Sequence, residues 1–381
     1  MRTDTTATDT TGTDTPGVRP TTGPADPTAR AAGEPLLVVE DLRTRLSTAR
    51  GALTAVDGVS FTLRAGETLG VVGESGSGKS VLGRSVMGLH TTGAGGTVTG
   101  RVSFAGTDVH ALDRSGRRAL WGSRIGMVFQ DPMTALNPVK KIGTHLTETV
   151  RGHARVSRAA ARARAEELLG LVGIPEPRRR LGQYPHELSG GMRQRVVIAM
   201  AIANEPELLI ADEPTTALDV TVQKQILDLL GRLRTELGTA IVLISHNLGV
   251  VSGRADRVAV MYAGRIVETA GAGELFRNPR HPYTGALLAS LPALDRAPHT
   301  RLDTIEGAPP DMVSPPPGCR FAPRCRFART DCRTVTPEPV PTDPVPTDAV
   351  PTDPVPTGDG PGSARHLFAC HHPLAVEGAH R

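Results

Sequence analysis

The sequence predicts an α/β fold that contains a parallel sheet, a helical subdomain and a small irregular C-terminal module. Between residues 35 and about 290, short β-branched runs alternate with longer helix-like stretches, a pattern typical of parallel sheets covered by helices. Residues 139–205 are predicted to be mostly helical. After Pro292 prolines accumulate, regular periodicity fades, and all four cysteines follow. The last segment is therefore expected to lack regular secondary structure.

Four short apolar runs have the length and the β-branched content of buried strands in a parallel sheet. Aromatic residues make up only 3% of the chain, so the core must consist mainly of Leu, Val, Ile and Ala. The folded part is expected to begin with the apolar run at residues 35–42. The four predicted strands are residues 68–72, 207–211, 240–244 and 258–262.

Composition divides the chain into three segments. Residues 1–34 are rich in Thr, Asp, Pro, Gly and Ala, and we expect a disordered tail because so few large apolar side chains cannot form a core. Residues 35–292 form the predicted folded domain. Residues 293–381 form a predicted cysteine module, within which a Pro-rich spacer (334–364) holds four copies of a five-residue unit. This spacer is expected to be extended and solvated.

Charge and hydropathy limit where the protein can act. The net charge of +4 is too small to indicate binding to nucleic acid or to a membrane surface. The longest apolar run, residues 196–203, is far shorter than the roughly 20 residues of a membrane-spanning helix. No apolar signal-peptide segment is visible. We therefore expect a cytoplasmic chain, in which clustered cysteines indicate a metal or redox site more than disulfides.

A phosphate-binding loop is predicted at residues 73–80, GESGSGKS, which fit the pattern G-x-x-x-x-G-K-[ST]. The loop follows a predicted strand and precedes a predicted helix, so backbone N–H groups would surround a phosphate. Lys79 would place a cation at the β- and γ-phosphates, and Ser80 would hold Mg²⁺. A glycine-rich turn without a ligand is the weaker alternative. The predicted ATP-binding residues are Gly73, Glu74, Ser75, Gly76, Ser77, Gly78, Lys79 and Ser80.

A second candidate site follows at residues 208–213, LLIADE, an apolar strand that ends in two carboxylates. Asp212 is placed to hold Mg²⁺ through water. Glu213 is placed to polarise the water that attacks the γ-phosphorus. Such strand ends are common without a catalytic role, and the phosphate loop makes the functional interpretation the stronger one.

The stretch LSGGMRQR (188–195) completes a set of motifs that resembles the nucleotide-binding subunits of ATP-binding-cassette (ABC) transporters. The resemblance covers residues 35 to about 290, and the motifs follow the order of the family. The remaining ones are Gln130 in VFQDP, the sequence ALD at 217–219, and His246 in LISHN. The resemblance implies a P-loop ABC ATPase domain.

The resemblance also implies a mechanism in which two cassettes hold two ATP molecules between them, head to tail. The catalytic residues would be Glu213 and His246, and His246 would contact the γ-phosphate. Gln130 would contact ATP and join Ser80 and Asp212 around Mg²⁺. Asp219 would lie at the dimer seam. The signature that contacts the ATP of the other cassette would be Leu188, Ser189, Gly190, Gly191 and Met192.

Two positions depart from the family pattern. Met192 stands where most cassettes have Gln, which leaves the amide-donating residues unchanged. The position where an aromatic ring usually stacks on adenine falls near Leu46, and residues 1–60 contain no Tyr, Phe or Trp. Nucleotide affinity or base selectivity is therefore expected to be weaker than usual.

Longer stretches, including DPMTALNP (131–138) and NPRHPYTGALLASLP (278–292), are similar to the ATPase subunits of dipeptide, oligopeptide and nickel importers. This similarity implies a peripheral subunit on the cytoplasmic face of the membrane. Its partners would be two permease subunits, a second and different ATPase subunit and, indirectly, an extracytoplasmic solute-binding protein, with no nucleic acid. The surface around Gln130, Asp131 and Leu136 is expected to meet a permease helix.

Three other kinds of cassette protein remain as alternatives. A soluble cassette protein of translation or DNA repair usually has two cassettes or long coiled-coil insertions. An iron–sulfur cassette protein of ribosome recycling has its cysteines ahead of two cassettes. An exporter subunit usually carries fused membrane helices. None of these features is visible in the sequence.

The cysteines Cys319, Cys325, Cys332 and Cys370 can come together if the repeat is looped out, because closure entropy grows slowly with length. Four thiolates suit either a [4Fe–4S] cluster or tetrahedral zinc. The tight C-x-x-C pairs that zinc sites favour are absent. Similar cysteines in the importer subfamily bind clusters, so the resemblance favours [4Fe–4S], with zinc and unligated thiols as alternatives.

Two further expectations concern this module. His371 and His372 directly follow the last cysteine and are expected to be surface residues, although either could replace a ligand. A serine at Cys325 is expected to unfold the module while residues 35–290 still bind ATP.

Overall fold

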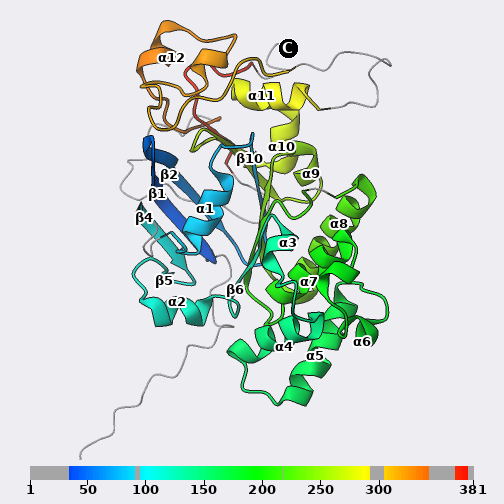
Figure 1. Cartoon of the computed structure of the whole chain (residues 1–381). Coiled ribbons are helices and arrows are strands. Elements are labelled where there is room, and N and C mark those ends of the chain that lie inside the picture. Colours follow the sequence, from blue (N-terminus) through cyan, green and yellow to red (C-terminus); the bar gives the residue numbers. More distant parts are fainter. Residues whose placement is uncertain (1–33, 91–94, 217, 292–303, 343–364, 376–381) are drawn as a thin grey trace, which may run out of the picture. The chain divides into compact units, whose positions relative to one another are not determined.

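The computed structural model describes residues 34–90, 95–216, 218–291, 304–342 and 365–375. The predicted N-terminal tail, apart from Glu34, and residues 343–364 of the predicted spacer lie outside these described residues. Pro35–Arg381 form one unit by contacts within the chain. Two sheets and the helices around them make up this unit (Figure 1).

An antiparallel sheet forms first along the chain and was not predicted from the sequence beyond its first strand. Its order is β2-β1-β4-β5. Buried and exposed residues alternate irregularly along its strands, because bulges shift the register between β1 and both of its neighbours. The strands are β1 (Leu37–Thr48), β2 (Gly51–Leu63), β4 (Gly96–Phe104) and β5 (Thr107–Asp108).

A larger sheet carries the site, in the order β11-β12-β10-β9-β3-β8-β7-β6. Its last five strands are parallel to one another, and every residue of β3, β7 and β8 is buried. The four strands predicted from apolar runs are confirmed, each to within one residue at either end. The five are β9 (Arg257–Tyr262), β3 (Thr68–Val72), β8 (Ala240–Ser245), β7 (Leu208–Asp212) and β6 (Ile125–Val128).

Three antiparallel strands extend this sheet: β10 (Arg265–Gly271), β12 (Leu367–Phe368) and β11 (Val340–Pro341). β11 begins inside the segment predicted to be an unpaired spacer. That prediction is wrong at this end, because Val340 pairs with Phe368 and thereby gains backbone hydrogen bonds. The C-terminal region is thus joined to the larger sheet.

A buried carboxylate fixes this junction. Glu268 of β10 accepts hydrogen bonds from the backbone N–H groups of Arg280 (2.6 Å) and His281 (2.9 Å). His366, just before β12, places Nε2 at 2.6 Å from the same carboxylate. A buried charge needs such partners to offset its lost hydration. Glu268 therefore ties the start of α11 (Pro282–Ala289) and the C-terminal strand to β10.

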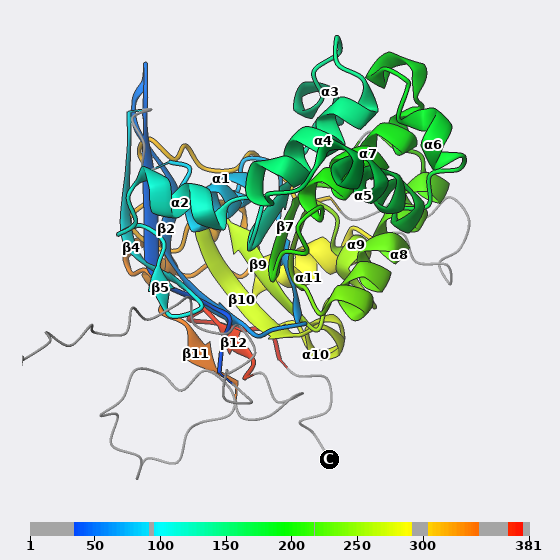
Figure 2. The same cartoon turned by 90° about the horizontal axis from the view of Figure 1, so that it is seen from below.

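The prediction of a mostly helical segment at 139–205 is confirmed. In α4 the buried residues Ile142, Leu146 and Val150 recur every four positions and form one apolar face. Figure 2 shows these helices grouped beside α8 (Val220–Leu237) and away from β1, β2 and β4. They are α4 (Ile142–His153), α5 (Arg158–Leu171), α6 (Pro177–Arg180) and α7 (Gly190–Ala201).

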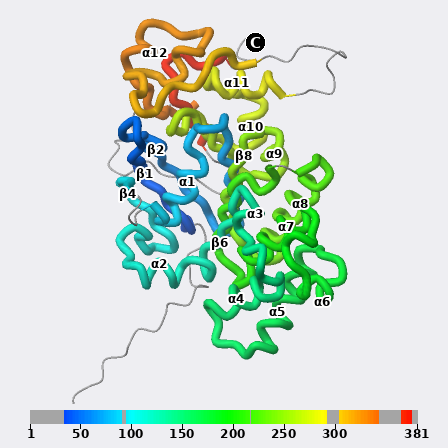
Figure 3. Tube along the Cα trace, in the orientation of Figure 1, coloured from blue at the N-terminus to red at the C-terminus, as the bar shows by residue number. Residues whose placement is uncertain are grey.

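The chain then passes through α10 (Ala272–Arg277) and α11 into the cysteine region, whose helix is α12 (Thr330–Thr334) (Figure 3). Phe321 of this region is buried against Tyr262 and Tyr283, with ring centroids 5.3 Å away in both cases. Its apolar residues therefore join the main core. None of the helices in the described part of the chain has the length and apolar character needed to cross a membrane.

Candidate functional site

The phosphate loop lies between β3 and α1 (Lys79–Val86), and two of its glycines are required by the space available. Gly73 has φ +155° and Gly78 has φ +99°, conformations that residues with side chains rarely adopt. A Cβ at Gly73 would lie 2.0 Å from the carbonyl oxygen of Met261, and one at Gly78 would lie 2.1 Å from that of Ala55. The loop is thus held tightly between β9 and β2.

Lys79 points back into this loop. Its Nζ donates to the carbonyl oxygens of Gly73 (2.7 Å) and Glu74 (2.9 Å) and to Oγ of Ser77 (3.3 Å). Burial lowers the pKa of Lys79 from its usual value, while nearby carboxylates oppose that shift. The side chain thus places a desolvated cation where the pattern predicts phosphate binding.

Ser80 and Asp212 meet as the magnesium prediction requires. Ser80 Oγ donates to Asp212 Oδ1 at 2.7 Å. Asp212 is fully buried, burial raises its pKa, and its Oδ2 has no hydrogen-bond partner among the described residues. A hydroxyl beside a buried carboxylate with a free oxygen offers the hard oxygen ligands that Mg²⁺ prefers. These residues fit the ion.

Two separately predicted residues, Gln130 and His246, converge on one carboxylate oxygen of a third, Glu213. Gln130 Nε2 donates to Glu213 Oε2 at 3.1 Å, and His246 Nδ1 lies 3.1 Å from the same atom. Gln130, Glu213 and His246 follow β6, β7 and β8, which are adjacent parallel strands, so their carboxyl ends lie at one edge of the sheet. A further donor was missed from the sequence: Thr216 Oγ1 donates to the same oxygen at 2.9 Å.

The backbone at Glu213 is strained. Its φ is +46°, a left-handed conformation that costs a non-glycine residue about 1–3 kcal/mol. The Glu213 N–H donates to the carbonyl of Ile244 in β8 at 3.0 Å, which holds the residue in place. Such strain persists where the surroundings fix a residue, and it aims this carboxylate at Gln130 and His246.

The predicted signature forms the start of α7. Ser189 is the N-cap, and its Oγ accepts from the N–H of Met192 at 3.3 Å. Leu188 is buried, and a Cβ at Gly191 would lie 2.6 Å from Val222 of α8. Within the described part of the chain, no hydrogen bond joins residues 188–192, Gly190 included, to the phosphate loop.

Asp219 and Leu46 have local roles that the sequence analysis did not assign. Asp219 is the N-cap of α8 and accepts from the N–H of Val222 at 2.9 Å. Leu46 is half-buried in β1 and pairs with Leu53. An aliphatic side chain thus occupies the position where the resemblance implies an aromatic ring. The first residue of the ALD motif, Ala217, lies outside the described residues.

The structure brings the four cysteines together at one small pocket, whose lining also includes His281, Phe321 and Phe327. The N–H of Cys319 donates to the carbonyl of Cys332 at 2.8 Å. Burial raises the pKa of Cys319 and Cys325, and it raises that of Cys370 to about 12. These three thiols are therefore neutral in this pocket unless a metal favours their thiolate forms.

The distances between possible metal-ligand atoms differ within the cysteine region. Asp331, Cys332 and His372 offer ligand atoms that all lie within 4.8 Å of one another. Across the described residues, which include all four cysteines, no three cysteine sulfur atoms come that close. His371 and His372 are partly exposed, as expected for surface residues, and they also line the cysteine pocket.

The phosphate loop, the Ser80–Asp212 pair and the carboxylate cluster at the ends of parallel strands define an ATPase of the ABC type. The model of the ABC transporter family matches residues 56–216. A second model, the C-terminal region of oligopeptide/dipeptide transporters, matches residues 267–332.

Individual relatives agree with these matches. The oligopeptide transport ATP-binding protein OppD of Bacillus subtilis is 53% identical over 293 residues, which cover 77% of this chain and 82% of that protein. The dipeptide transport ATP-binding protein DppD of the same organism is 49% identical over 304 residues, covering 80% and 90%. The dimeric post-hydrolysis structure of the cassette MJ0796 with ADP and Pi has a TM-score of 0.56 at 27% identity, covering 62% of this chain and 98% of that one.

The chain therefore belongs to the ATP-binding proteins of oligopeptide and dipeptide ABC transporters, as the motifs predicted. The alternatives in translation and DNA repair find no support among these relatives.

Proposed function

We propose that this chain is the ATP-hydrolysing subunit that powers an ABC importer for dipeptides and oligopeptides. The observation that carries the catalytic part is the convergence of Gln130, Thr216 and His246 on one oxygen of Glu213. The substrate class is supported by the printed functions of the Bacillus subtilis relatives. The second family match, which covers the C-terminal region, supports the same class.

In the proposed reaction each residue has one task. Lys79 and the loop amides would bind the β- and γ-phosphates, and Ser80 and Asp212 would hold Mg²⁺, directly and through water. When bound, the ion would neutralise charge at the phosphates. Glu213 accepts a proton from the attacking water, while His246 and Gln130 keep its carboxylate oriented.

The experiment for this function is Glu213→Gln, which removes the base and keeps its shape. Hydrolysis by the assembled transporter should fall by at least about 10²-fold, while ATP binding and an ATP-bound cassette dimer persist. The partner cassette's site must be disabled in parallel, because two sites can work unequally. Glu236→Gln, at an exposed position of α8, is the matched control and should keep full turnover. Unchanged turnover in Glu213→Gln would contradict the assignment.

The signature is proposed to act on ATP held by a second cassette. Its residues form the N-terminus of a 12-residue helix and make no hydrogen bond to this chain's own phosphate loop within the described residues. A helix N-terminus favours an anion, and small residues let backbone amides approach it. The dimeric MJ0796 cassette supports this arrangement. Asp219, at the start of α8, is proposed to lie at the dimer seam.

The docking surface for the permeases is proposed to surround α3 (Pro132–Ala135). Met133 is 58% exposed and Val139 is 79% exposed, whereas Leu136, expected at this surface, is only 3% exposed and is not available. Arg193 of α7 contacts Sδ of Met133 at 2.7 Å, which links this surface to the signature helix.

The partners proposed are two permease subunits, a second and different ATPase subunit, and indirectly a solute-binding protein. The chain would then sit at the cytoplasmic face of the membrane. No nucleic-acid partner is proposed.

The cysteine pocket is proposed to hold a [4Fe–4S] cluster with a structural role, through Cys319, Cys325, Cys332 and Cys370. Sulfur atoms around tetrahedral zinc lie about 3.8 Å apart, given Zn–S bonds of about 2.3 Å. No three of these four sulfur atoms lie within 4.8 Å of one another, and a cluster is larger than one ion. The apolar lining and the four gathered thiols fit such a group.

Elemental analysis of anaerobically purified full-length protein checks the cluster. About four iron atoms and four sulfides per chain are expected, with a brown colour. Cys319→Ser should lower the iron content per chain. One zinc atom per chain and no iron would contradict the cluster. The zinc would then be bound either by the cysteines or by Asp331, Cys332 and His372.

A further inference from the structure

An arginine of the cysteine region reaches into the phosphate loop. Arg324 directly precedes Cys325, and its side chain is 5% exposed. Its Nη1 donates to Glu74 Oε2 at 2.7 Å, and its Nη2 donates to Glu74 Oε1 at 3.1 Å. Glu74 is the second residue of the phosphate loop. The two side chains thus form a bidentate pair between segments 250 residues apart.

The guanidinium of Arg324 is fixed on its other sides as well. Nε donates to the carbonyl of Glu306 at 2.9 Å, and Nη2 donates to that of Ile305 at 3.1 Å. Nη1 also lies 3.2 Å from the hydroxyl of Tyr262. Burial disfavours the charged form, but the bonds to Glu74 and Tyr262 outweigh burial and raise the pKa of Arg324. The Arg324 guanidinium is therefore charged, held on several sides and largely shielded from water.

The backbone of Glu74 is held by the region that includes α11. The Glu74 N–H donates to the hydroxyl of Tyr283 at 2.9 Å. Tyr283 is fully buried, and its ring packs against Tyr262 and Phe321 at centroid distances of 4.5 and 5.3 Å. Both the main chain and the side chain of Glu74 thus depend on residues C-terminal to β9.

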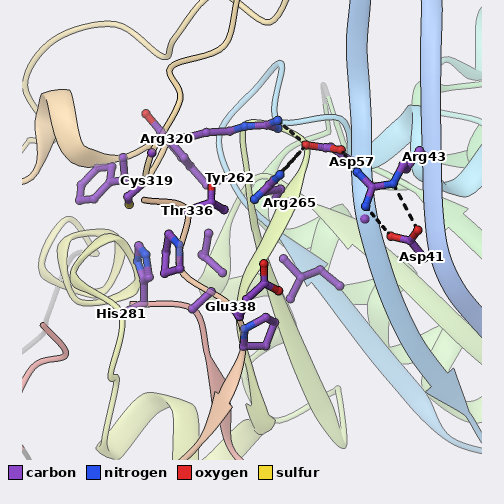
Figure 4. A pocket seen from close by; sticks show the side chains of 18 residues that line it. Asp41, Arg43, Asp57, Tyr262, Arg265, His281, Cys319, Arg320, Thr336 and Glu338 are labelled. Carbon is purple, nitrogen blue, oxygen red and sulfur yellow. Dashed lines mark hydrogen bonds and ion pairs between the residues drawn. The ribbon is translucent and has the colours of Figure 1, made fainter. Parts of the chain in front are cut away.

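A second arginine makes a parallel link from the neighbouring cysteine. Arg320 follows Cys319, donates to the carbonyl of Ala263 and pairs with Asp57, as Figure 4 shows for Asp57. Ala263 and Gly264 form the turn between β9 and β10, and the Gly264 N–H donates to the carbonyl of Ser77 at 2.8 Å. Arg324 therefore connects to the phosphate loop directly, and Arg320 connects to it through this turn.

We propose that Arg324 is a positioning residue of the ATP site, which holds the phosphate loop through Glu74 and neutralises the charge of that carboxylate beside the bound phosphates. This inference rests on the proposed ATP-binding function. Its physical basis is that an unpaired carboxylate near a triphosphate repels it, whereas a carboxylate in a bidentate pair does not. ATP affinity consequently depends on an ordered cysteine region.

A double-mutant cycle in the full-length chain tests the electrostatic part. Arg324→Gln should raise the Kd for MgATP about tenfold, measured by isothermal titration calorimetry, because Glu74 is left unpaired. In a Glu74→Gln background, the same Arg324→Gln change should alter the Kd by less than about twofold. The penalty of Arg324→Gln should also grow as the salt concentration falls.

Controls separate this inference from a general structural role. Arg326→Gln removes an exposed arginine on the other side of Cys325 and should leave the Kd unchanged. Iron content and thermal unfolding of each variant report whether the cysteine region is intact. Equal penalties of Arg324→Gln in both backgrounds, or none in either, would overturn the inference.

A separate measurement distinguishes failure of the proposed ATP-binding function from failure of this inference. If the unaltered chain binds MgATP no better than its Lys79→Ala variant, the ATP site itself is wrong. If the unaltered chain binds and the cycle shows no coupling, only the role of Arg324 is wrong. The links through Arg320 and Arg324 also change one expectation from the sequence: a serine at Cys325 should weaken ATP binding as well as disturb the cysteine region.

Discussion

Asp57 is a buried carboxylate of β2 that pairs with arginines from three parts of the chain. Arg43 comes from β1, Arg265 from β10 and Arg320 from the cysteine region. Burial alone would raise the pKa of Asp57, but the bonds and charges of these arginines outweigh burial and lower it. A single side chain thereby connects both sheets to the C-terminal region.

Asp57→Asn should destabilise the fold by about 3 kcal/mol, because the change leaves charged partners without their counterion. Thermal unfolding of the full chain at pH 7 measures this. Asp41→Asn is the matched control, since Asp41 also pairs with Arg43 but is mostly exposed, and its cost should be below about 1 kcal/mol.

The pH dependence of that difference has a defined sign. A carboxylate with a lowered pKa in the folded state stabilises the fold above its unfolded pKa, and this stabilisation is lost as the pH falls through the folded pKa. The gap in unfolding temperature between Asp57→Asn and the unaltered chain should therefore shrink as the pH drops from 7 toward 3. A gap that widens on acidification would contradict the ion-pair role.

At the scale of single residues, the sequence predicted the residues that belong to known motifs. It did not predict the residues that hold those motif residues in place. Ser80, Asp212 and Glu213 follow from motifs whose spacing encodes their chemistry. Arg324 belongs to no pattern, because its partner lies 250 residues away and only the fold brings them together. Tyr283 lay in a quoted stretch, yet nothing in that stretch indicated that its hydroxyl would accept from the phosphate loop.

Among the elements, α7 begins with the residues that we propose contact the ATP of a second cassette. Its N-cap serine satisfies one backbone N–H of the helix, and the glycines that follow keep the surface free of side chains. Gly191 packs against Val222 of α8, so the signature is also braced by the helix that Asp219 caps.

Ser189→Arg should abolish hydrolysis at the partner cassette's site in the assembled transporter, because a bulky side chain separates the amides from phosphate. The Kd of the isolated chain for MgATP should change by less than about threefold. Loss of the N-cap should lower the free energy of unfolding by about 1 kcal/mol. Ser157→Arg, at the N-cap of α5, is a matched control that loses a similar cap and should keep hydrolysis. Loss of binding in the isolated Ser189→Arg chain would show that the signature does not act in trans.

Elements differed in how well the sequence predicted them. Four of the five parallel strands are uniform apolar runs and were predicted to within a residue, whereas β6 was not predicted. The antiparallel sheet was missed beyond its first strand because bulges break the alternation of β1 and β2. β11 and β12 are two residues long, and their pairing depends on tertiary contacts more than on any local pattern.

For the molecule as a whole, the sequence predicted the family, the order of motifs and the gathering of the four cysteines. It treated the C-terminal region as a separate module. The structure instead joins that region to the ATPase through Glu268, Asp57 and Glu74, all of them carboxylates buried or half-buried far from their partners in sequence. Charge pairs of this kind produce no periodic pattern in the sequence. Composition alone therefore predicted a domain boundary after residue 292 that contacts in the structure cross.

The strand order has a consequence for whether another chain can add a strand to the larger sheet. An exposed sheet edge is a template onto which another chain can add a strand. Here β12 covers β10, and among the described residues the outermost strand on that side is β11, which is short and ends in Pro341, a residue without an N–H to donate. The C-terminal residues thus give the eight-stranded sheet a blunt end that discourages aggregation.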